Sequence, residues 1–393
     1  MKFKYLKIKD ISKTQSWWTP SRAKAEFWWW DIIWLKSGEL NDNQNVTKYT
    51  ETITQAGIEW SSAKIFPKWT LVMAMYGATA WKLGILWVDA ATNQAICSIQ
   101  NHKWMFVEKY VYYFLLKERE KIIQDSFWWA QPNISKTYID NLQIPLPPLV
   151  TQQKIVEKLD ELSAVIKENQ EKIRGQIVAL DELWKSQLDE VFSNEEWENN
   201  TIEYISLGIQ YWYTGKTIEN GKYQYLRITD IQNDKVDWNT VPFVNVEDIE
   251  AKKYTLNKFD IVFARTWATV GKSYLIEEEV EDKLFASYLI RIVPNLKLVV
   301  PKFLKFFFQS NNYWNQIYFD VVGAAQPNFN GTKLSSVQLP LPPLSTQKAI
   351  VQELDELQKG ITELKTQYTT QLEQYDELRN SLLDQAFKGE LVK

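Results

Sequence analysis

The stretch IPLPPLVTQQKIVEKLDEL, from Ile144 to Leu162, returns as LPLPPLSTQKAIVQELDEL from Leu339 to Leu357, 195 residues later. Gln131-Pro132-Asn133 stands before the first copy, and Gln326-Pro327-Asn328 stands before the second. A repeat with so long a period indicates that a whole structural unit is duplicated. We therefore expect two copies of a globular domain, each followed by a helix.

Both segments after the proline pairs have the apolar spacing of a coiled coil. Residues 148–195 and 343–393 place apolar side chains at alternating steps of three and four, which predicts a narrow helical seam. The seam positions are Ile155, Leu159, Leu162, Ile166, Ile173, Leu180 and Leu183 in the first segment, and Ile350, Leu354, Leu357, Ile361, Leu364, Tyr368, Tyr375, Leu378 and Leu382 in the second. We expect the two helices to pair antiparallel. The alternative is that each helix folds back onto its own domain.

The remaining segments, residues 1–147 and 196–342, are expected to form two globular domains of the α/β (α+β) class. TLVMAMYGAT (70–79) and DIVFARTWAT (260–269) are short apolar runs that predict strands ending in turns. FVEKYVYYFLLKERE (106–120) and VPKFLKFFFQSNNYWNQI (300–317) predict helices. The expected architecture is thus an internal two-fold repeat, in which two long helices forming an antiparallel coiled coil separate the domains.

Several kinds of catalytic and metal site are excluded by residue content. The chain has one cysteine, Cys97, and one histidine, His102, too few for a clustered zinc site. No phosphate-binding glycine loop, dinucleotide-binding glycine motif or amino-methyltransferase motif occurs. No apolar run is long enough for a membrane-spanning helix, and the single cysteine is typical of a cytoplasmic protein. We expect a binding protein without a catalytic site, metal or cofactor.

Charge is distributed unevenly along the chain, although its formal net charge is only −4. Residues 1–147 carry a net charge of +5, and residues 196–342 carry −2. The two helical segments carry −4 and −3. A basic surface favours nucleic acid, whereas acidic helices favour a protein partner. The first domain is therefore the stronger candidate for contacting DNA.

The repeated junctions resemble those of the specificity subunit of type I restriction–modification systems, over essentially the full chain. The resemblance rests on two copies of Gln-Pro-Asn, Pro-Leu-Pro-Pro-Leu and the following helix, and on the final LRNSLLDQAFKGEL (378–391). It implies two target-recognition domains that each read half of a bipartite double-stranded DNA sequence. It also implies that the helices set the unread spacer and dock two methyltransferase subunits, which restriction subunits then join for DNA methylation and phage defence. The specificity subunit is not itself catalytic in this family.

Candidate DNA contacts lie in three loops of each domain. Base edges in the major groove would discriminate sequence, while phosphate contacts would position the protein. The candidates are Thr19, Ser21, Arg22, Lys24, Lys36, Ser37 and Lys82 in the first domain, and Thr214, Lys216, Thr217, Arg227, Thr229, Asp230, Arg265, Thr266 and Lys272 in the second. Two other hypotheses remain open: a coiled-coil adaptor with protein-binding end domains, and an enzyme with unrecognised motifs.

Tryptophan and glycine exchange places between the repeats. Trp128 aligns with Gly323, Trp267 with Gly77, and Trp81 with Gly271. The chain has 19 tryptophans but only 13 glycines, about half the usual glycine share of ~7%. One hypothesis is that many of these tryptophans are glycines in the cell, encoded by a reassigned UGA codon. The alternative is a set of genuine aromatic residues that stack on DNA.

Overall fold

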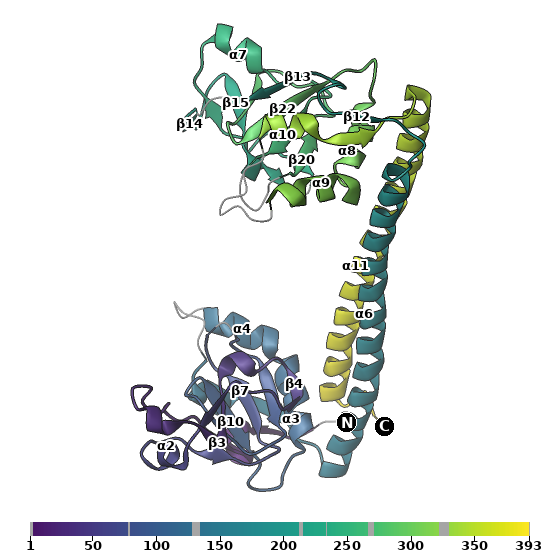
Figure 1. Ribbon diagram of the computed structural model, residues 1–393. Helices are drawn as coiled ribbons and strands as arrows, with labels where there is room; N and C mark the ends of the chain where they lie inside the picture. The colour runs from purple at the N-terminus through teal and green to yellow at the C-terminus, as the bar shows by residue number, and fades with distance from the viewer. Residues whose placement is uncertain are drawn as a thin grey trace. The chain divides into compact units, whose positions relative to one another are not determined.

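A computed structural model of the chain describes residues 3–77, 79–127, 134–211, 215–232, 234–265, 271–321 and 330–392. Residue contacts divide the chain into two compact units. Unit 1 is Met1–Ile173 with Thr370–Lys393, and unit 2 is Arg174–Thr369. Each unit holds one α/β domain and part of both long helices (Figure 1). The predicted fold class, two α/β domains with two long helices, is confirmed.

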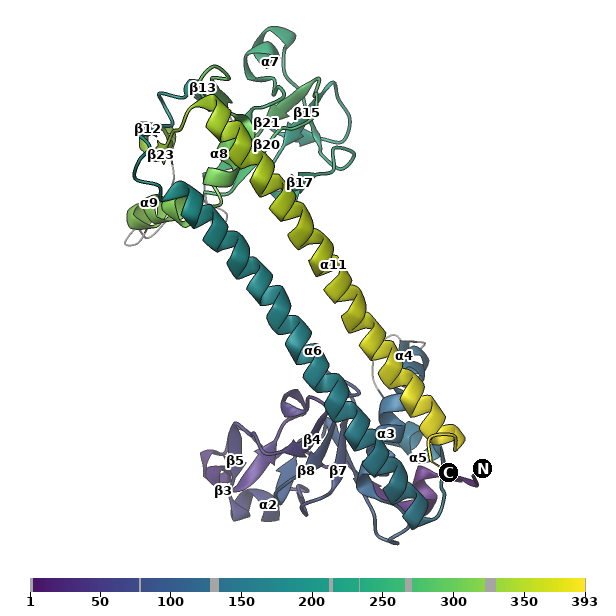
Figure 2. The same ribbon diagram turned by 90° about the vertical axis from the view of Figure 1, so that its right-hand side faces the viewer.

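The two long helices begin directly after the proline pairs. Helix α6 runs over Leu149–Phe192 and helix α11 over Leu344–Lys388, each unbroken in Figure 2. Proline fits ahead of the first helical turn because its missing N–H needs no partner there. The carbonyl of Pro148 accepts the N–H of Gln152 at 3.0 Å, and that of Pro343 accepts the N–H of Gln347 at 3.0 Å.

Within each unit, the segments of α6 and α11 run antiparallel. In unit 1, Gln170 Nε2 donates to Asp376 Oδ1 at 3.2 Å, and Leu159 shares a buried cluster with Leu383. In unit 2, Lys365 forms an ion pair with Asp181, and Leu188 and Leu354 share a cluster. In both units, therefore, residue numbers rise along α6 as they fall along α11. These contacts confirm the antiparallel pairing inside each unit.

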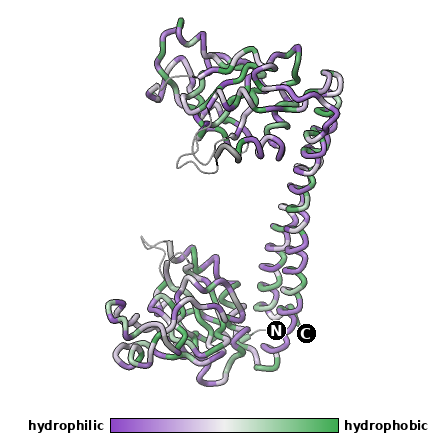
Figure 3. Tube along the Cα trace, in the orientation of Figure 1, coloured by the Kyte–Doolittle hydropathy of each residue, from purple (hydrophilic) through white to green (hydrophobic). Residues whose placement is uncertain are grey.

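The buried seam follows most of the predicted positions. Ile155, Leu159, Ile166, Ile173, Ile350, Leu354 and Ile361 are buried, and Leu162, Leu180 and Leu357 are partly buried. In Figure 3, hydrophobic segments recur along both helices between hydrophilic ones.

Leu183, Leu364 and Leu378 depart from the seam prediction: they are 43%, 39% and 46% exposed. An α-helix has about 3.6 residues per turn, so a 3.5-residue pattern drifts around a straight helix. Beside Leu364, Lys365 forms an ion pair with Asp181 of α6. The sequence pattern was wrong for these three leucines because it assumed a constant repeat along the whole of each helix.

The domain of unit 1 is built on two main sheets. A five-stranded sheet has the order β2-β10-β7-β8-β4, a four-stranded sheet has the order β5-β3-β9-β6, and β1 pairs with β11. The strands are β1 Tyr5–Lys7, β2 Lys13–Gln15, β3 Trp28–Leu35, β4 Asn43–Val46, β5 Glu51–Ile53, β6 Ile65–Phe66, β7 Leu71–Ala74, β8 Leu83–Leu86, β9 Ala90–Thr92, β10 Ile96–Gln100 and β11 Gln143–Pro145. The helices are α1 Ile8–Ile11, α2 Gln55–Glu59, α3 Glu108–Lys117, α4 Arg119–Phe127 and α5 Lys136–Asn141.

The domain of unit 2 repeats this plan. Its four-stranded sheets have the orders β13-β22-β19-β20 and β14-β18-β15-β21, and β12 pairs with β23 as β16 does with β17. The strands are β12 Asn199–Thr201, β13 Ser206–Tyr211, β14 Thr217–Ile218, β15 Tyr223–Leu226, β16 Ile231–Gln232, β17 Lys235–Val236, β18 Phe243–Val244, β19 Ile261–Ala264, β20 Ser273–Leu275, β21 Lys283–Phe285, β22 Leu289–Pro294 and β23 Gln338–Pro340. The helices are α7 Asp248–Tyr254, α8 Pro301–Phe307, α9 Asn311–Val321 and α10 Gly331–Ser336.

Alternation along the central strands builds a core on each face of the sheet. Leu71 and Met73 of β7 join Tyr110 of α3 in one cluster, whereas Val72 and Ala74 join a cluster that includes residues of the second sheet. Successive strand residues point to opposite faces, so an apolar strand needs a cover on both. In unit 2, Ile261 and Phe263 of β19 pack with Phe303 of α8, and Val262 packs with Tyr225 of the second sheet. The two runs predicted as strands, 70–79 and 260–269, therefore contain the central strands of equivalent sheets.

Candidate nucleic-acid interface

Two candidate cations of the first domain share one carboxylate. Arg22 Nη2 lies 2.7 Å from Glu51 Oε2, and Lys36 Nζ lies 2.9 Å from Glu51 Oε1. Partial burial alone would raise the pKa of Glu51, but Arg22 and Lys36 outweigh it and lower the pKa. The Arg22 guanidinium also lies 4.3 Å from the ring centre of Trp28. Arg22, Lys36 and Glu51 together therefore carry a net charge of +1, and the carboxylate holds both cations in place.

The second and third candidate loops of this domain also touch. Thr79 Oγ1 donates to the carbonyl of Ser37 at 2.7 Å. The N–H of Lys82 donates to the carbonyl of Thr79 at 3.1 Å. The structure thus brings the loop of Lys36 and Ser37 against the turn that ends at Lys82, from segments more than forty residues apart in sequence.

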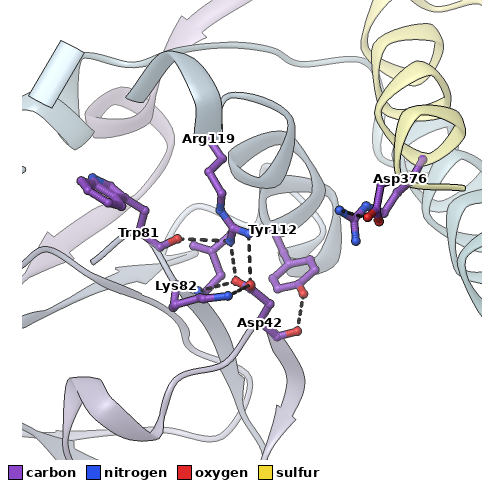
Figure 4. A network of polar contacts seen from close by, with 8 residues as sticks. Asp42, Trp81, Lys82, Tyr112, Arg119 and Asp376 are labelled. Atoms are coloured by element: carbon purple, nitrogen blue, oxygen red, sulfur yellow. Dashed lines mark hydrogen bonds and ion pairs between the residues drawn. The ribbon is translucent and has the colours of Figure 1, made fainter. Parts of the chain in front are cut away.

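Lys82 enters a network centred on Asp42, shown in Figure 4. Asp42 Oδ2 accepts from Lys82 Nζ and Arg119 Nη1, both at 3.0 Å, and Oδ1 accepts from Arg119 Nη2 and from the N–H of Leu83. The backbone carbonyl of Asp42 accepts from Tyr112 Oη at 2.6 Å. Burial alone would raise the pKa of Asp42, but Arg119, the Leu83 N–H and Lys82 lower it below its ordinary value of 3.8. Asp42 therefore stays ionised and holds both cations in place.

Sequence reasoning missed Asp42, Glu51 and Arg119. Arg119 follows Asp42 by 77 residues, and Glu51 follows Lys36 by 15, so no short motif marks either pair. The second domain has a similar aspartate: Asp42 has a left-handed backbone, with φ of 58°, and so does Asp234. Asp234 is also held by a cation from a helix, Lys305, at 2.9 Å.

The loop from Thr19 to Lys24 is fixed by a separate set of bonds. The N–H and Oγ1 of Thr19 both donate to Gln94 Oε1, at 3.1 and 2.6 Å. The carbonyl of Ser21 accepts the indole N–H of Trp28 at 3.2 Å. Lys24 Nζ lies 5.0 Å from the ring centre of Phe27. These candidates sit on an ordered loop, and only Arg22 links it to Lys36.

In the second domain, Arg227 is engaged by its neighbour Asp230. Arg227 Nε donates to Asp230 Oδ2 at 3.0 Å, and Nη2 donates to Oδ1 at 2.7 Å. The N–H of Arg227 also bonds Asp230 Oδ2, at 2.8 Å, just as the N–H of Lys36 bonds Glu39 Oε2 at 2.7 Å. Arg227 and Lys36 therefore occupy equivalent turns. For a bidentate contact with guanine, Arg227 must release the carboxylate of Asp230 and bind the base in its place.

The other described candidates of the second domain have contacts of their own or are exposed. Arg265 lies 5.4 Å from the ring centre of Tyr211 and donates to the carbonyl of Ser287 at 3.5 Å. Lys216, Thr217 and Lys272 are exposed, and the carbonyl of Thr229 accepts from Gln232 Nε2 at 2.8 Å. Thr214 and Thr266 lie outside the described residues.

Metal ligands do not gather in the described part of the chain, where no group of three or more His, Cys, Asp or Glu side chains is placed to hold a metal ion. Cys97 is buried, and burial raises the pKa of its thiol to about 12. No described helix has both the length and the apolar content to cross a membrane.

Known proteins resemble this chain in both sequence and fold. The family model described as "Type I restriction modification DNA specificity domain" matches twice, over residues 2–179 and 176–374. The specificity subunit of the type I restriction enzyme EcoBI from Escherichia coli is 24% identical over 335 residues, covering 77% of this chain and 70% of that subunit. The EcoKI specificity subunit from Escherichia coli strain K12 is 25% identical over 319 residues, with 76% and 68% covered. A chain solved in a study of the assembly and conformational transition of the type I R-M system has a TM-score of 0.79 at 15% identity, with 99% and 98% covered.

Proposed function

Because the chain belongs to the family of type I restriction–modification DNA specificity proteins, we propose that it reads a bipartite DNA target, one half with each domain. The observation that carries this proposal is the duplication itself. Both units contain an equivalent central strand and an equivalent strand pair at the strand-to-helix junction. Two copies of one reading domain in a single chain suit a target made of two separate half-sites.

The proposed DNA face of the first domain is the connected group of Arg22, Lys36 and Lys82. Its cations are held by the half-buried carboxylates of Glu51 and Asp42, so they are ordered before DNA arrives. Ordered cations lose little conformational freedom on binding and keep their reach to phosphates and base edges. In the second domain, we assign base reading to Arg227, with Lys216, Arg265 and Lys272 as phosphate contacts.

The long helices are proposed to set the unread spacer and to dock two methyltransferase subunits, which restriction subunits join. Apolar side chains outside the buried seam support this docking: Val165, Val178, Leu183, Leu364 and Leu378 are 39–55% exposed. Such side chains along acidic helices suit a protein partner better than DNA phosphate. The proposal gives this chain no catalytic step and no cofactor, and it places the complex in the cytoplasm. The adaptor alternative has less support, because both family matches are to a DNA specificity domain.

The test is to co-express the chain with its genomic methyltransferase neighbour and to map methylated adenines by single-molecule sequencing. The expected result is one motif of two short halves separated by a fixed unread spacer. Arg227→Ala should relax only one half, and the double change Arg22→Ala with Lys36→Ala should relax only the other. Lys297→Ala, at an exposed position of unit 2, is the matched control. A single continuous motif, or methyl transfer by this chain without a partner, would overturn the proposal.

A further inference from the structure

Four of the described tryptophans have a backbone conformation that suits glycine. Trp29, Trp69, Trp81 and Trp104 have φ angles of 70°, 74°, 68° and 53°. In this left-handed region the Cβ of an L-residue approaches the following carbonyl, so bulky side chains are genuine outliers there. Asp42, Asp234 and Asp282 also have positive φ, but aspartate tolerates this region through local hydrogen bonds.

Trp81 occupies the same turn as a glycine of the second domain. The N–H of Trp81 donates to the carbonyl of Ala74 at 2.8 Å, and the N–H of Gly271 donates to that of Ala264 at 3.0 Å. Gly271 has a φ of 82°, close to the 68° of Trp81. The two positions are therefore equivalent in hydrogen bonding and in backbone conformation, and one of them is glycine.

Trp29 lies in a β-bulge of strand β3. Both Trp28 and Ile32 pair with Ile53 of β5, so the chain carries extra residues between them. A bulge residue in the left-handed conformation is typically glycine. The indole of Trp29 is 67% exposed, and that of Trp104, in the loop after β10, is 80% exposed.

Other tryptophans have ordinary structural roles. Trp34 is completely buried in the first domain. Trp184 Nε1 donates to Gln309 Oε1 at 3.2 Å, and Trp238 Nε1 donates to Glu278 Oε1 at 2.7 Å. Trp69 also has a positive φ, of 74°, but Phe259 has the same φ of 74° at the equivalent position of the second domain. The counterpart of Trp69 is thus also aromatic, and the repeat does not point to glycine at this position.

Replacing tryptophan by glycine also restores the repeat. With glycine at positions 81 and 267, residues 77–82 become Gly-Ala-Thr-Ala-Gly-Lys and residues 267–272 become Gly-Ala-Thr-Val-Gly-Lys. The chain contains 13 glycines, whereas a usual share of ~7% would be about 27, so roughly 14 are missing. The 19 tryptophans are numerous enough to supply them.

We propose that Trp29, Trp81 and Trp104 are glycines in the protein that the cell makes, because its gene encodes them with UGA and the cell reads UGA as glycine. UGA differs by one base from the glycine codon GGA and by one base from the tryptophan codon UGG. A translation that reads UGA as tryptophan would therefore write Trp at positions built for Gly. The alternative, that genuine aromatic residues stack on DNA, would then not apply at these three positions.

The first test uses the gene and the native protein. UGA codons are expected at positions 29, 81 and 104, and UGG codons at 34, 184 and 238. Peptide mass spectrometry of the protein purified from its own cells should find glycine at the first three positions. UGG codons there, or tryptophan in those peptides, would overturn the inference.

The second test uses the chain as written here, produced in a host with the standard code. Trp29→Gly and Trp104→Gly should leave Tm unchanged or raise it by a few degrees, because strain is relieved and little buried surface is lost. Trp34→Gly is the matched control and should lower Tm strongly. The double variant Trp29→Gly with Trp104→Gly should bind DNA as the parent does. A large drop in Tm, or a loss of DNA binding in that variant alone, would show that these indoles are genuine and overturn the inference.

Discussion

Gln152 and Gln347 make the same three hydrogen bonds at the starts of the two long helices. Gln152 Nε2 donates to the carbonyls of Pro147 at 2.8 Å and Met105 at 3.1 Å, and its Oε1 accepts the N–H of Val107 at 2.9 Å. Gln347 does the same with Pro342 at 2.8 Å, Leu298 at 3.0 Å and Val300 at 2.8 Å. Both side chains are fully buried. Each carboxamide thus connects the start of a long helix to the loop that precedes another helix, α3 in unit 1 and α8 in unit 2.

Gln152→Leu should lower the free energy of unfolding by about 2–4 kcal/mol. The change keeps the approximate volume but leaves the Val107 N–H and two carbonyls without partners in a buried place, which costs roughly 1–3 kcal/mol per group before relaxation. Urea unfolding of the purified chain measures the difference. Gln153→Leu, on the exposed side of the same turn, should change stability by less than about 0.5 kcal/mol. Equal effects of the two substitutions would contradict the role given to Gln152.

Phe387→Ala should destabilise unit 1 by about 3–5 kcal/mol, since it removes a large buried side chain. Phe387 comes from the last turn of α11, but its ring packs 5.1 Å from that of Tyr110 and 5.4 Å from that of Phe114. Phe192, at the end of α6, packs against Phe303 and Phe307 in the same way in unit 2. Protection of unit 1 amides, measured by hydrogen exchange, should fall in Phe387→Ala and persist in Phe192→Ala. Loss of protection in unit 2 alone after Phe387→Ala would be inconsistent with this packing.

Asp42→Asn should lower stability by roughly 1–3 kcal/mol near neutral pH, where the ionised Asp42 binds Arg119 and Lys82. The folded state lowers the pKa of Asp42, so the ionised form stabilises the fold above its ordinary pKa of 3.8. This contribution is lost as the pH falls below 3.8, through the lowered pKa. The difference in unfolding free energy between the parent and the variant should therefore be constant near pH 7 and shrink at pH 3. The exposed Asp31→Asn is the control, and a gap that widened on acidification would refute the network.

Deleting residues 166–172 together with residues 374–380 should shorten the unread spacer by about three base pairs. The hydrogen bond from Gln170 to Asp376 places these heptads opposite each other in unit 1. Seven helical residues rise roughly 10 Å, and a base pair about 3.4 Å. The methylated half-sites should stay unchanged, because neither deletion removes a residue of 1–147 or 196–342. Deletion from one helix only is the control, and it should abolish methylation because α6 and α11 would no longer pair in register. Changed half-sites in the double deletion would refute the spacer model.

Local sequence was sufficient for the architecture. The 195-residue period, the proline pairs and the alternating apolar steps placed both helices and the duplicated domains. The runs 70–79 and 260–269 contain the central strands, because a short apolar stretch bounded by a turn is typical of a buried strand. The predicted helices at 106–120 and 300–317 each divide into two, α3 with α4 and α8 with α9, a break that the apolar pattern alone did not mark.

The candidate DNA surface was only partly accessible to sequence reasoning. Lys36 and Arg227 were both among the predicted candidates, and the turns around them depend on nearby residues. That Asp42 holds Arg119, and that Glu51 joins Arg22 to Lys36, depended on segments far apart in the chain. The partner of a charged side chain is set by where the sheets bring these segments together, and no spacing rule encodes that.

The sequence by itself determined the duplication, the class of each element and the helix starts, since these depend on neighbouring residues, on proline geometry and on periodicity. Only the tertiary structure decided that Gln152 and Gln347 bond the same buried groups, that Phe387 completes the core of unit 1, and that Leu364 and Leu378 stay exposed. Only the tertiary structure, too, shows that the backbones of Trp29, Trp81 and Trp104 are left-handed. The physical reason is that burial, pairing and φ at a given residue follow from the packing of distant segments, whereas periodicity is carried by the residues beside it.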